Sequence, residues 1–206
     1  AGRATAFLTL PKTGMTRAGI IKVATSLALA SDYMEDGDTV DFLVGLPELG
    51  VLDHLQILNT SKETELVTSK GIAKIGETVR PEVFQAILNL SVELADKGRE
   101  GKPIGTIFVV GDEEKVLQYS KQMIINPFKG YDEEERNILS STLKETIREF
   151  SAMDGAFVIS GDGVILTAGR YLGPGIDDAK LPRGLGSRHI AAAGITTLTN
   201  AIAFVI

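Results

Sequence analysis

Two apolar runs separated by three turn residues constrain this fold more than any other feature of the sequence. The runs are Ala156–Ser160 and Val164–Tyr171, and Gly161-Asp162-Gly163 stands between them. An Asp-Gly pair between two strand-like runs is a strong signal for a β-hairpin. The sequence therefore predicts an antiparallel pair of strands in the C-terminal part of the chain.

From residue 81 onward, the apolar spacing alternates between helical and strand-like. A long helix is expected to begin at Asp132, a good N-cap residue, and to present Leu139 and Phe150 on its apolar face. The other expected elements are an amphipathic helix at Val83–Ala95, a buried strand at Ile104–Val110, a short helix at Glu113–Ser120, one or two helical turns at Arg188–Gly194 and a final strand at Ala201–Ile206.

The first third of the chain is predicted to be a smaller α/β unit. Its expected elements are a strand at Thr5–Leu10, a helix at Met15–Ala30, a strand at Thr39–Gly45, an apolar segment at Val51–Leu58 whose pattern is ambiguous and admits a helix, and a weak strand at Glu63–Ser69. The segment Gly71–Pro81 holds two glycines and a proline, so we expect the chain to divide there. We therefore predict two domains, residues 1–75 and residues 80–206.

Composition removes several classes of protein from consideration. The 206 residues carry a net charge of -6, and neither part of the chain is basic, so we expect no nucleic-acid partner. There is no cysteine, and His54 and His189 are the only histidines, which excludes disulfide frameworks, thiolate metal sites and multi-histidine metal sites. No apolar run has the length of a membrane span and the first residues lack the form of a signal peptide, so we expect a cytoplasmic protein without a membrane partner.

The first segment with candidate chemistry is Asp154-Gly155-Ala156, between a predicted helix and a predicted strand. A carboxylate followed by two small residues leaves room for a ligand to approach the backbone. The same residues also fit a plain helix end, with Gly155 just after the C-cap. Both interpretations stay open, because the common signatures of P-loop proteins, dinucleotide-binding folds and hydrolases are absent.

The second segment is Gly186-Ser187-Arg188-His189, which leads into a predicted helix. The first N–H groups of a helix bind anions, and an arginine adds bidentate contacts to phosphate. Ser187 offers a hydroxyl or an N-cap. The alternative is a glycine-rich turn in which Ser187 only caps the helix and Arg188 is solvated.

In combination, the two segments are more specific than either one alone. Asp154-Gly155-Ala156, an apolar hairpin, a loop rich in glycine and proline, and then Gly186-Ser187-Arg188-His189-Ile190-Ala191-Ala192 follow one another in an order that resembles the diadenylate cyclase (DAC) domain family. That family carries a D-G-A motif and, about 30 residues later, a G-T-R-H-R-A-A motif. The resemblance spans residues 80–206. It implies an α/β fold with a mixed central β-sheet flanked by helices, preceded by the smaller α/β domain as in archaeal-type members.

The resemblance implies that two ATP molecules condense into cyclic di-AMP with release of pyrophosphate. Asp154 would be the catalytic carboxylate and would hold Mn²⁺ or Mg²⁺. Two sites would have to face each other across a two-fold homodimer, and higher homo-oligomers stay open. Tyr171 and Leu172 are the candidates for the adenine pocket. The neighbouring Arg170 is expected to be solvated, with a contribution of positive potential at the mouth of the ATP site as the alternative. The full set of implied ATP-binding residues is Gly155, Ala156, Tyr171, Leu172, Gly186, Ser187, Arg188, His189 and Thr196.

Three positions depart from the pattern of the family. Ile190 stands where a second arginine is usual, and Thr197 and Asn200 stand in place of acidic residues in a downstream G-I-S-E-x-S-D pattern. These departures motivate an alternative, a degenerate domain that binds ATP or cyclic di-AMP as a sensor. A structural module without any nucleotide is a third hypothesis.

Overall fold

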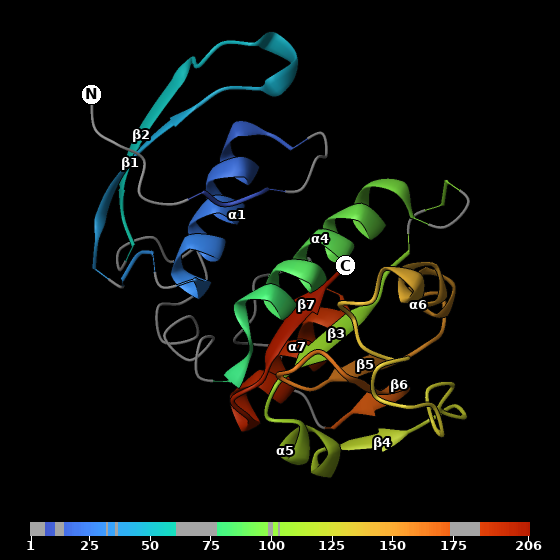
Figure 1. The fold of residues 1–206 in the computed structure, drawn as a ribbon. Helices are drawn as coiled ribbons and strands as arrows, with labels where there is room; N and C mark the ends of the chain where they lie inside the picture. The colour runs from blue at the N-terminus through green and yellow to red at the C-terminus, as the bar shows by residue number, and fades with distance from the viewer. Residues whose placement is uncertain are drawn as a thin grey trace. The chain divides into compact units, whose positions relative to one another are not determined.

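The fold of the chain was obtained as a computed structural model, which describes residues 7–10, 15–31, 33–35, 37–60, 78–98, 101–102, 104–173 and 186–206. Ala1–Glu77 and Thr78–Ile206 form two compact units, and each contains a sheet of its own (Figure 1). The predicted domains, residues 1–75 and 80–206, stay a prediction, because compactness does not test whether either part folds alone.

The first unit packs one helix against a two-stranded antiparallel sheet. Its elements are α1 (Arg17–Ala30), β1 (Thr39–Val44), the 3₁₀ helix η1 (Pro47–Leu49) and β2 (His54–Asn59). Val44 and Leu58 on one face of the sheet pack against Ile21 of α1 and form the core of this unit. The ambiguous segment Val51–Leu58 thus contains the start of a strand, because its backbone pairs in register with β1. The predicted strand at Thr5–Leu10 is not formed at residues 7–10, and Glu63–Ser69 lies outside the described residues.

The second unit contains a five-stranded mixed sheet with the order β4-β6-β5-β3-β7. Its strands are β3 (Ile107–Val110), β4 (Ser120–Gln122), β5 (Ala156–Ile159), β6 (Ile165–Leu172) and β7 (Ile202–Val205). Strands β3 and β5 are parallel, and every other neighbouring pair is antiparallel. This confirms the predicted α/β class with a mixed central sheet, and β5–β6 is the predicted hairpin.

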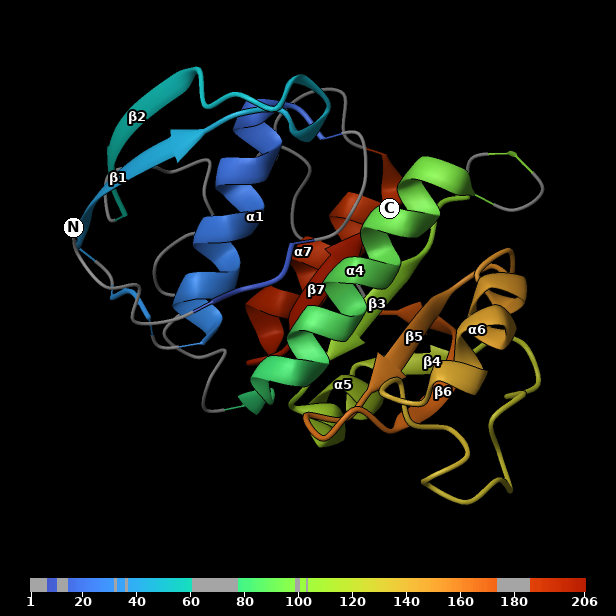
Figure 2. The ribbon, with the colours of Figure 1, turned by 45° about the horizontal axis from the view of Figure 1, so that its top comes forward.

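Helices cover both faces of this sheet (Figure 2). They are α4 (Pro81–Lys97), α5 (Glu113–Gln118), α6 (Lys144–Phe150) and α7 (Ser187–Leu198). On one face, Phe84 of α4 contacts Phe204 of β7 with ring centroids 5.2 Å apart. On the other face, Val116 of α5 and Ala192 of α7 join one hydrophobic cluster with residues of β3 and β5. Among the described residues, no helix is both long and apolar enough to cross a membrane.

The prediction of a long helix that begins at Asp132 is wrong. Only α6, preceded by the 3₁₀ helix η2 (Ser141–Leu143), is helical in this segment. The Ile138 N–H donates to the Gly163 carbonyl at 2.8 Å, and the Ile165 N–H donates to the Arg136 carbonyl at 2.9 Å. Backbone groups that bond to the hairpin are not free to form a helix, so tertiary pairing overrides the local signal. Helix α7, in contrast, is longer than the one or two turns predicted.

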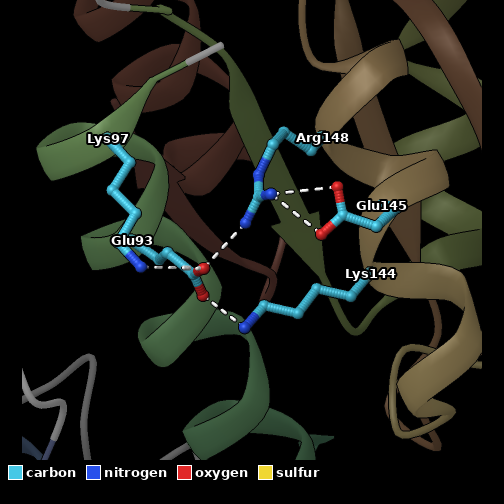
Figure 3. A network of polar contacts seen from close by, with 5 residues as sticks. All are labelled: Glu93, Lys97, Lys144, Glu145 and Arg148. Carbon is cyan, nitrogen blue, oxygen red and sulfur yellow. Dashed lines mark hydrogen bonds and ion pairs between the residues drawn. The ribbon is translucent and has the colours of Figure 1, made fainter. Parts of the chain in front are cut away.

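A network of charged side chains holds α6 against α4 (Figure 3). Glu93 of α4 forms ion pairs with Lys144 and with Arg148 of α6, the latter at 2.7 Å, and a weaker one with Lys97 at 3.7 Å. Arg148 also contacts Glu145 at 2.8 Å. Burial opposes ionisation of Glu93, but the Lys144 hydrogen bond and the three positive charges outweigh it and hold the pKa of that carboxyl below its usual value. The network thereby fixes the helix that leads directly to Asp154.

Candidate functional site

One end of the five-stranded sheet brings together the two segments with candidate chemistry. Because β3 and β5 are parallel, with Ile107 opposite Ala156, the residues that precede these strands lie at the same end. Gly105 precedes β3, and Asp154-Gly155 precedes β5. Arg188, at the start of α7, reaches the same end, since its Nη1 lies only 2.5 Å from where a Cβ on Gly105 would stand. We call this the amino end of the sheet, after its two parallel strands.

The turn before β5 depends on Gly155. Its φ is +100°, and a Cβ there would lie 2.7 Å from the backbone N of Arg170 in β6. The close approach of the two strands is therefore sufficient reason for a glycine, and its contact with ATP stays a prediction. The Asp154 side chain is exposed and, among the described residues, has no hydrogen bond or ion pair. The turn thus presents an unengaged carboxylate to solvent.

Helix α7 begins without a capping side chain. Gly186 occupies the N-cap and Ser187 is the first helical residue, so the prediction that Ser187 caps the helix is wrong. The first turn holds no acidic residue. The His189 N–H donates to the Gly186 carbonyl at 3.0 Å, whereas the N–H groups of Ser187 and Arg188 have no partner among the described residues. Unpartnered N–H groups at the positive end of a helix dipole suit an anion.

The side chain of Arg188 lies against Gly105, which precedes β3. A Cβ on Gly105 would stand 2.8 Å from Cζ of Arg188 and 3.0 Å from the Ile206 carbonyl oxygen, so the missing side chain makes room for the guanidinium. Arg188 is exposed and forms no ion pair within the described part of the chain, and His189 beside it is half-buried. The sequence analysis assigned no role to Gly105 and placed it inside the predicted strand Ile104–Val110, whereas β3 begins at Ile107.

The last residues of the hairpin divide between surface and core. Tyr171 is 56% exposed, whereas Leu172 is 3% exposed and belongs to the core cluster, as does Ala156. Tyr171 is therefore the accessible side chain of the predicted adenine pocket. The expectation that Arg170 is solvated is wrong, because it is half-buried and its Nε donates to Ser120 Oγ at 2.8 Å.

Three predicted or questioned positions lie further along α7. Thr196 is nine residues after Ser187, about 13 Å along the helix axis, and its hydroxyl donates to the Ala192 carbonyl at 3.0 Å. Thr197 donates to the Ala193 carbonyl at 2.8 Å. The structure therefore does not bring Thr196 to the amino end, and the half-buried Ile190 adds no polar group there.

The opposite end of the parallel strands, the carboxyl end, is filled by the protein itself. The Arg80 N–H donates to the Gly161 carbonyl at 3.1 Å, and a Cβ on Gly161 would overlap the Thr78 carbonyl. Asp112 accepts a hydrogen bond from the Asn200 N–H at 2.7 Å. Ligands of open α/β sheets commonly bind beyond the carboxyl ends of the strands. Here that position is closed, and the unpartnered groups lie at the amino end.

The donor set at the amino end fits a divalent ion that arrives with phosphates. Among the described residues, no group of three or more His, Cys, Asp or Glu side chains could hold a metal ion. One exposed carboxylate such as Asp154 suits Mg²⁺ or Mn²⁺, which take most of their ligands from phosphate and water at such sites. The residues thus fit a nucleotide-bound ion better than an ion held by protein ligands alone.

Comparisons with known proteins show which family the chain resembles. Residues 93–206 match the model of the DAC family, described as DisA bacterial checkpoint controller nucleotide-binding. A diadenylate cyclase of Methanocaldococcus jannaschii is 36% identical over 188 residues, which cover 91% of this chain and 60% of the relative. A diadenylate cyclase of Haloferax volcanii is 34% identical over 188 residues, which cover 90% of this chain and 67% of the relative. The chain thus spans about two thirds of the length of these curated relatives.

The match to the Methanocaldococcus protein is wider than the family match. Because 188 of the 206 residues align, the alignment includes most of the first unit as well as the second. Among solved structures, a hypothetical membrane spanning protein from Bacillus cereus superposes with a TM-score of 0.44 and 17% identity, over 67% of this chain and 60% of that chain.

Proposed function

Because the chain belongs to the diadenylate cyclase (DAC) family, we propose that it condenses two ATP molecules into cyclic di-AMP. In each step, the 3′-hydroxyl oxygen of one ATP bonds to the α-phosphorus of the other. The bond from that phosphorus to the bridging oxygen breaks, pyrophosphate leaves with the oxygen and its electron pair, and the proton of the 3′-hydroxyl passes to solvent. Two such steps close the ring. The observation that carries the proposal is that Asp154 and the uncapped start of α7 lie at the same end of the sheet.

Asp154 is the residue that would hold Mg²⁺ or Mn²⁺. When bound, the ion supplies positive charge that stabilises the pentacoordinate phosphate and makes the 3′-hydroxyl a better nucleophile. The chain contributes the position of the carboxylate, which the Gly155 turn and the anchored helix α6 determine. Exposure of Asp154 supports this role, since a carboxylate already paired within the protein would have to break that contact first.

The start of α7 would bind the triphosphate. The free N–H groups of Ser187 and Arg188 can donate to phosphate oxygens, and the Arg188 guanidinium can add a bidentate contact. Gly186 leaves the approach open, because nothing lies within 4 Å of where its Cβ would stand. His189 would brace the turn. Charge stabilisation of this kind is most of what a protein contributes to phosphoryl transfer.

The nucleoside would lie along the end of the hairpin. Tyr171 offers an exposed ring on which adenine can stack. Alternation along β6 places this ring on the face opposite Arg170 and Leu172, so the nucleotide would pass around the end of the sheet. A ligand could contact three further predicted residues only through their backbone atoms or the edge of the core, namely Gly155, Ala156 and Leu172. We assign them backbone contacts alone. Thr196 is omitted, because its position along α7 separates it from the amino end.

The chemistry requires two sites that face each other. Each ATP provides one nucleophile and one electrophile, so a two-fold homodimer, alone or within a higher homo-oligomer, would complete the reaction. The partners are therefore ATP and a second copy of the chain, with no membrane and no nucleic acid. A cytoplasmic location, where ATP is available, belongs to the same proposal.

A sensor that binds ATP or cyclic di-AMP without turnover is the second candidate. Ile190 favours it, since the residue offers no charge where the family has an arginine, and so does Thr197, whose hydroxyl bonds within its own helix.

Incubation of the purified chain with ATP and Mn²⁺ or Mg²⁺, with products identified by mass spectrometry, separates the two candidates. We expect cyclic di-AMP from the wild type and from Asp162→Asn, a charge-matched change in the hairpin turn, and none from Asp154→Asn. Product from Asp154→Asn would contradict the role of that carboxylate. ATP binding by calorimetry without product, at concentrations where the chain is dimeric, would contradict the cyclase and support the sensor.

A further inference from the structure

A second arginine at the amino end has an environment unlike that of the other described arginines. Arg170 lies on β6 opposite Ala156 and is half-buried. Its guanidinium donates to Ser120 Oγ and to the Ser120 carbonyl, both at 2.8 Å, and to the Leu117 carbonyl at 3.0 Å. A longer bond of 3.4 Å reaches Gln122 Oε1. These bonds hold the planar guanidinium group of Arg170 rigidly across the junction between α5 and β4.

All four acceptors of Arg170 are neutral. Within the described part of the chain no carboxylate pairs with it, whereas Arg148 pairs with Glu93 and Arg136 lies 4.0 Å from Glu133. Desolvation lowers the pKa of the Arg170 guanidinium, but an arginine remains charged at any physiological pH. A fixed positive charge without a counter-charge is costly in a half-buried position unless an anion binds nearby.

The Arg170 side chain also lies on the sheet face and at the sheet end that the proposed site uses. Arg170 and Leu172 are two residues apart on one strand and so share a face. Leu172 belongs to the cluster that includes Val116 of α5 and Ala192 of α7. The backbone N of Arg170 is the atom closest to the missing Cβ of Gly155. The charge is thus placed beside the Asp154 turn, on the face that α7 covers.

We propose that Arg170 is a phosphate-positioning residue: its preorganised guanidinium attracts and orients the polyphosphate of a nucleoside triphosphate at the amino end. One of its five N–H groups is not used by the four bonds and is free to donate to a ligand oxygen. This inference rests on the proposed nucleotide site, and it deepens that proposal by adding a cation from the sheet to the one from α7.

The test compares three variants of the full chain by calorimetric titration with Mn·ATP at several salt concentrations, together with KM and kcat. Arg170→Gln removes the charge, and Arg170→Lys keeps the charge but not the fork. Arg136→Gln is the matched control, because Arg136 also donates to a β6 carbonyl, that of Ile165 at 2.9 Å, but at the other end of the strand. Thermal unfolding of each variant measures separately how much the arginine contributes to the stability of the fold.

We expect Arg170→Gln to weaken Mn·ATP binding about 10- to 100-fold, with a shallower salt dependence and a rise in KM larger than the fall in kcat. Arg170→Lys should restore most of the affinity, and Arg136→Gln should unfold at lower temperature yet bind ATP within about twofold of the wild type. Wild-type affinity in folded Arg170→Gln would overturn the proposal.

If Arg170→Gln does not fold, Arg170→Lys decides the question, because a tenfold loss of affinity in that variant would contradict a role that depends on charge. Failure of the proposed function can be distinguished from failure of the role of Arg170. A wild type that binds ATP but forms no cyclic di-AMP contradicts the cyclase and leaves the affinity test of Arg170 intact, whereas a wild type that does not bind ATP contradicts both.

Discussion

The two ends of the parallel strands carry similar residues in opposite circumstances. At the carboxyl end, Gly111-Asp112 follows β3, and Asp112 is bonded to the Asn200 N–H and lies 3.6 Å from Lys115. At the amino end, Asp154-Gly155 precedes β5, and Asp154 has no protein partner among the described residues. An aspartate beside a glycine is a structural element at one end and a candidate catalytic group at the other. What distinguishes them is whether the surrounding backbone already satisfies the carboxylate.

The variant with the largest expected effect replaces an aspartate by asparagine at the amino end, and the same substitution at the carboxyl end is its control. Asp154→Asn is expected to lower cyclic di-AMP production by about 100- to 1000-fold, because it removes the charge that would hold the metal ion. Its unfolding temperature should stay close to that of the wild type, since the exposed side chain has no hydrogen bond or ion pair among the described residues. Initial rates with Mn·ATP, normalised to folded protein, measure the effect.

Asp112→Asn is the control at the carboxyl end. Asn accepts the same hydrogen bond from Asn200 and tolerates the positive φ of this position, 44°, so activity should be retained. Equal losses of activity in the two variants would break the comparison between the ends.

The second test concerns the turn itself. Gly155→Ala should destabilise the protein by about 2 to 3 kcal/mol, because the new Cβ meets the backbone of Gly169 and Arg170 at a positive φ. Gly130→Ala is the control, since Gly130 has a similar φ of +95° and nothing within 4 Å, and it should cost about 1 kcal/mol. Urea unfolding measures both free energies, and an equal cost would show that strain alone, rather than close strand approach, requires Gly155.

The third test loosens the support of the amino end. Glu93→Gln should cost about 1 to 2 kcal/mol, because Lys144 and Arg148 lose the charge of a carboxylate whose side chain is only 18% exposed. The cost stays modest because Lys144 is 48% exposed. The pKa of Glu93 is lower in the folded protein than in the unfolded chain. The ionised carboxylate therefore stabilises the fold fully at pH values above the unfolded-state pKa, and this stabilisation is lost as the pH falls through the folded-state pKa.

The difference in unfolding temperature between wild type and Glu93→Gln should therefore be constant at neutral pH and shrink below about pH 4. Glu145→Gln, which alters an exposed partner of Arg148, should change stability by less than about 0.5 kcal/mol. A difference that persists at pH 2 would mean that packing, not charge, holds α6 in place.

The smallest test fills the empty cap of α7. Gly186→Asp should raise stability by a few tenths of a kcal/mol, because a carboxylate can now accept from the first N–H groups of the helix. The same carboxylate would compete with phosphate, so Mn·ATP affinity should fall severalfold. Gly186→Ser, an uncharged cap, should weaken ATP binding less, and a Gly186→Asp protein that binds ATP normally would place the triphosphate elsewhere.

Local signals predicted more of the fold than of the site. The β5–β6 hairpin was predictable because Gly161-Asp162-Gly163 and its flanking runs are adjacent in the chain. The helix expected from Asp132 failed because its backbone bonds to the hairpin. Asp154 and Arg188 were found as motif residues, but their meeting point was not. Gly105 and Arg170 could not be assigned, since their contacts come from residues far away in the sequence, as in the 50-residue separation of Arg170 and Ser120.

The pairing of β3 with its two neighbours also governs when the protein can fold during its own synthesis. Ile107 of β3 lies opposite Ala156 of β5 and Val205 of β7, roughly 50 and 100 residues later, and such distant pairings slow folding. As the chain leaves the ribosome, the four apolar residues of β3 have no strand to pair with until much of the second unit has been synthesised. Translation rate and chaperone binding over residues 107–202 should therefore influence the yield of folded protein more than the sequence of the first unit does.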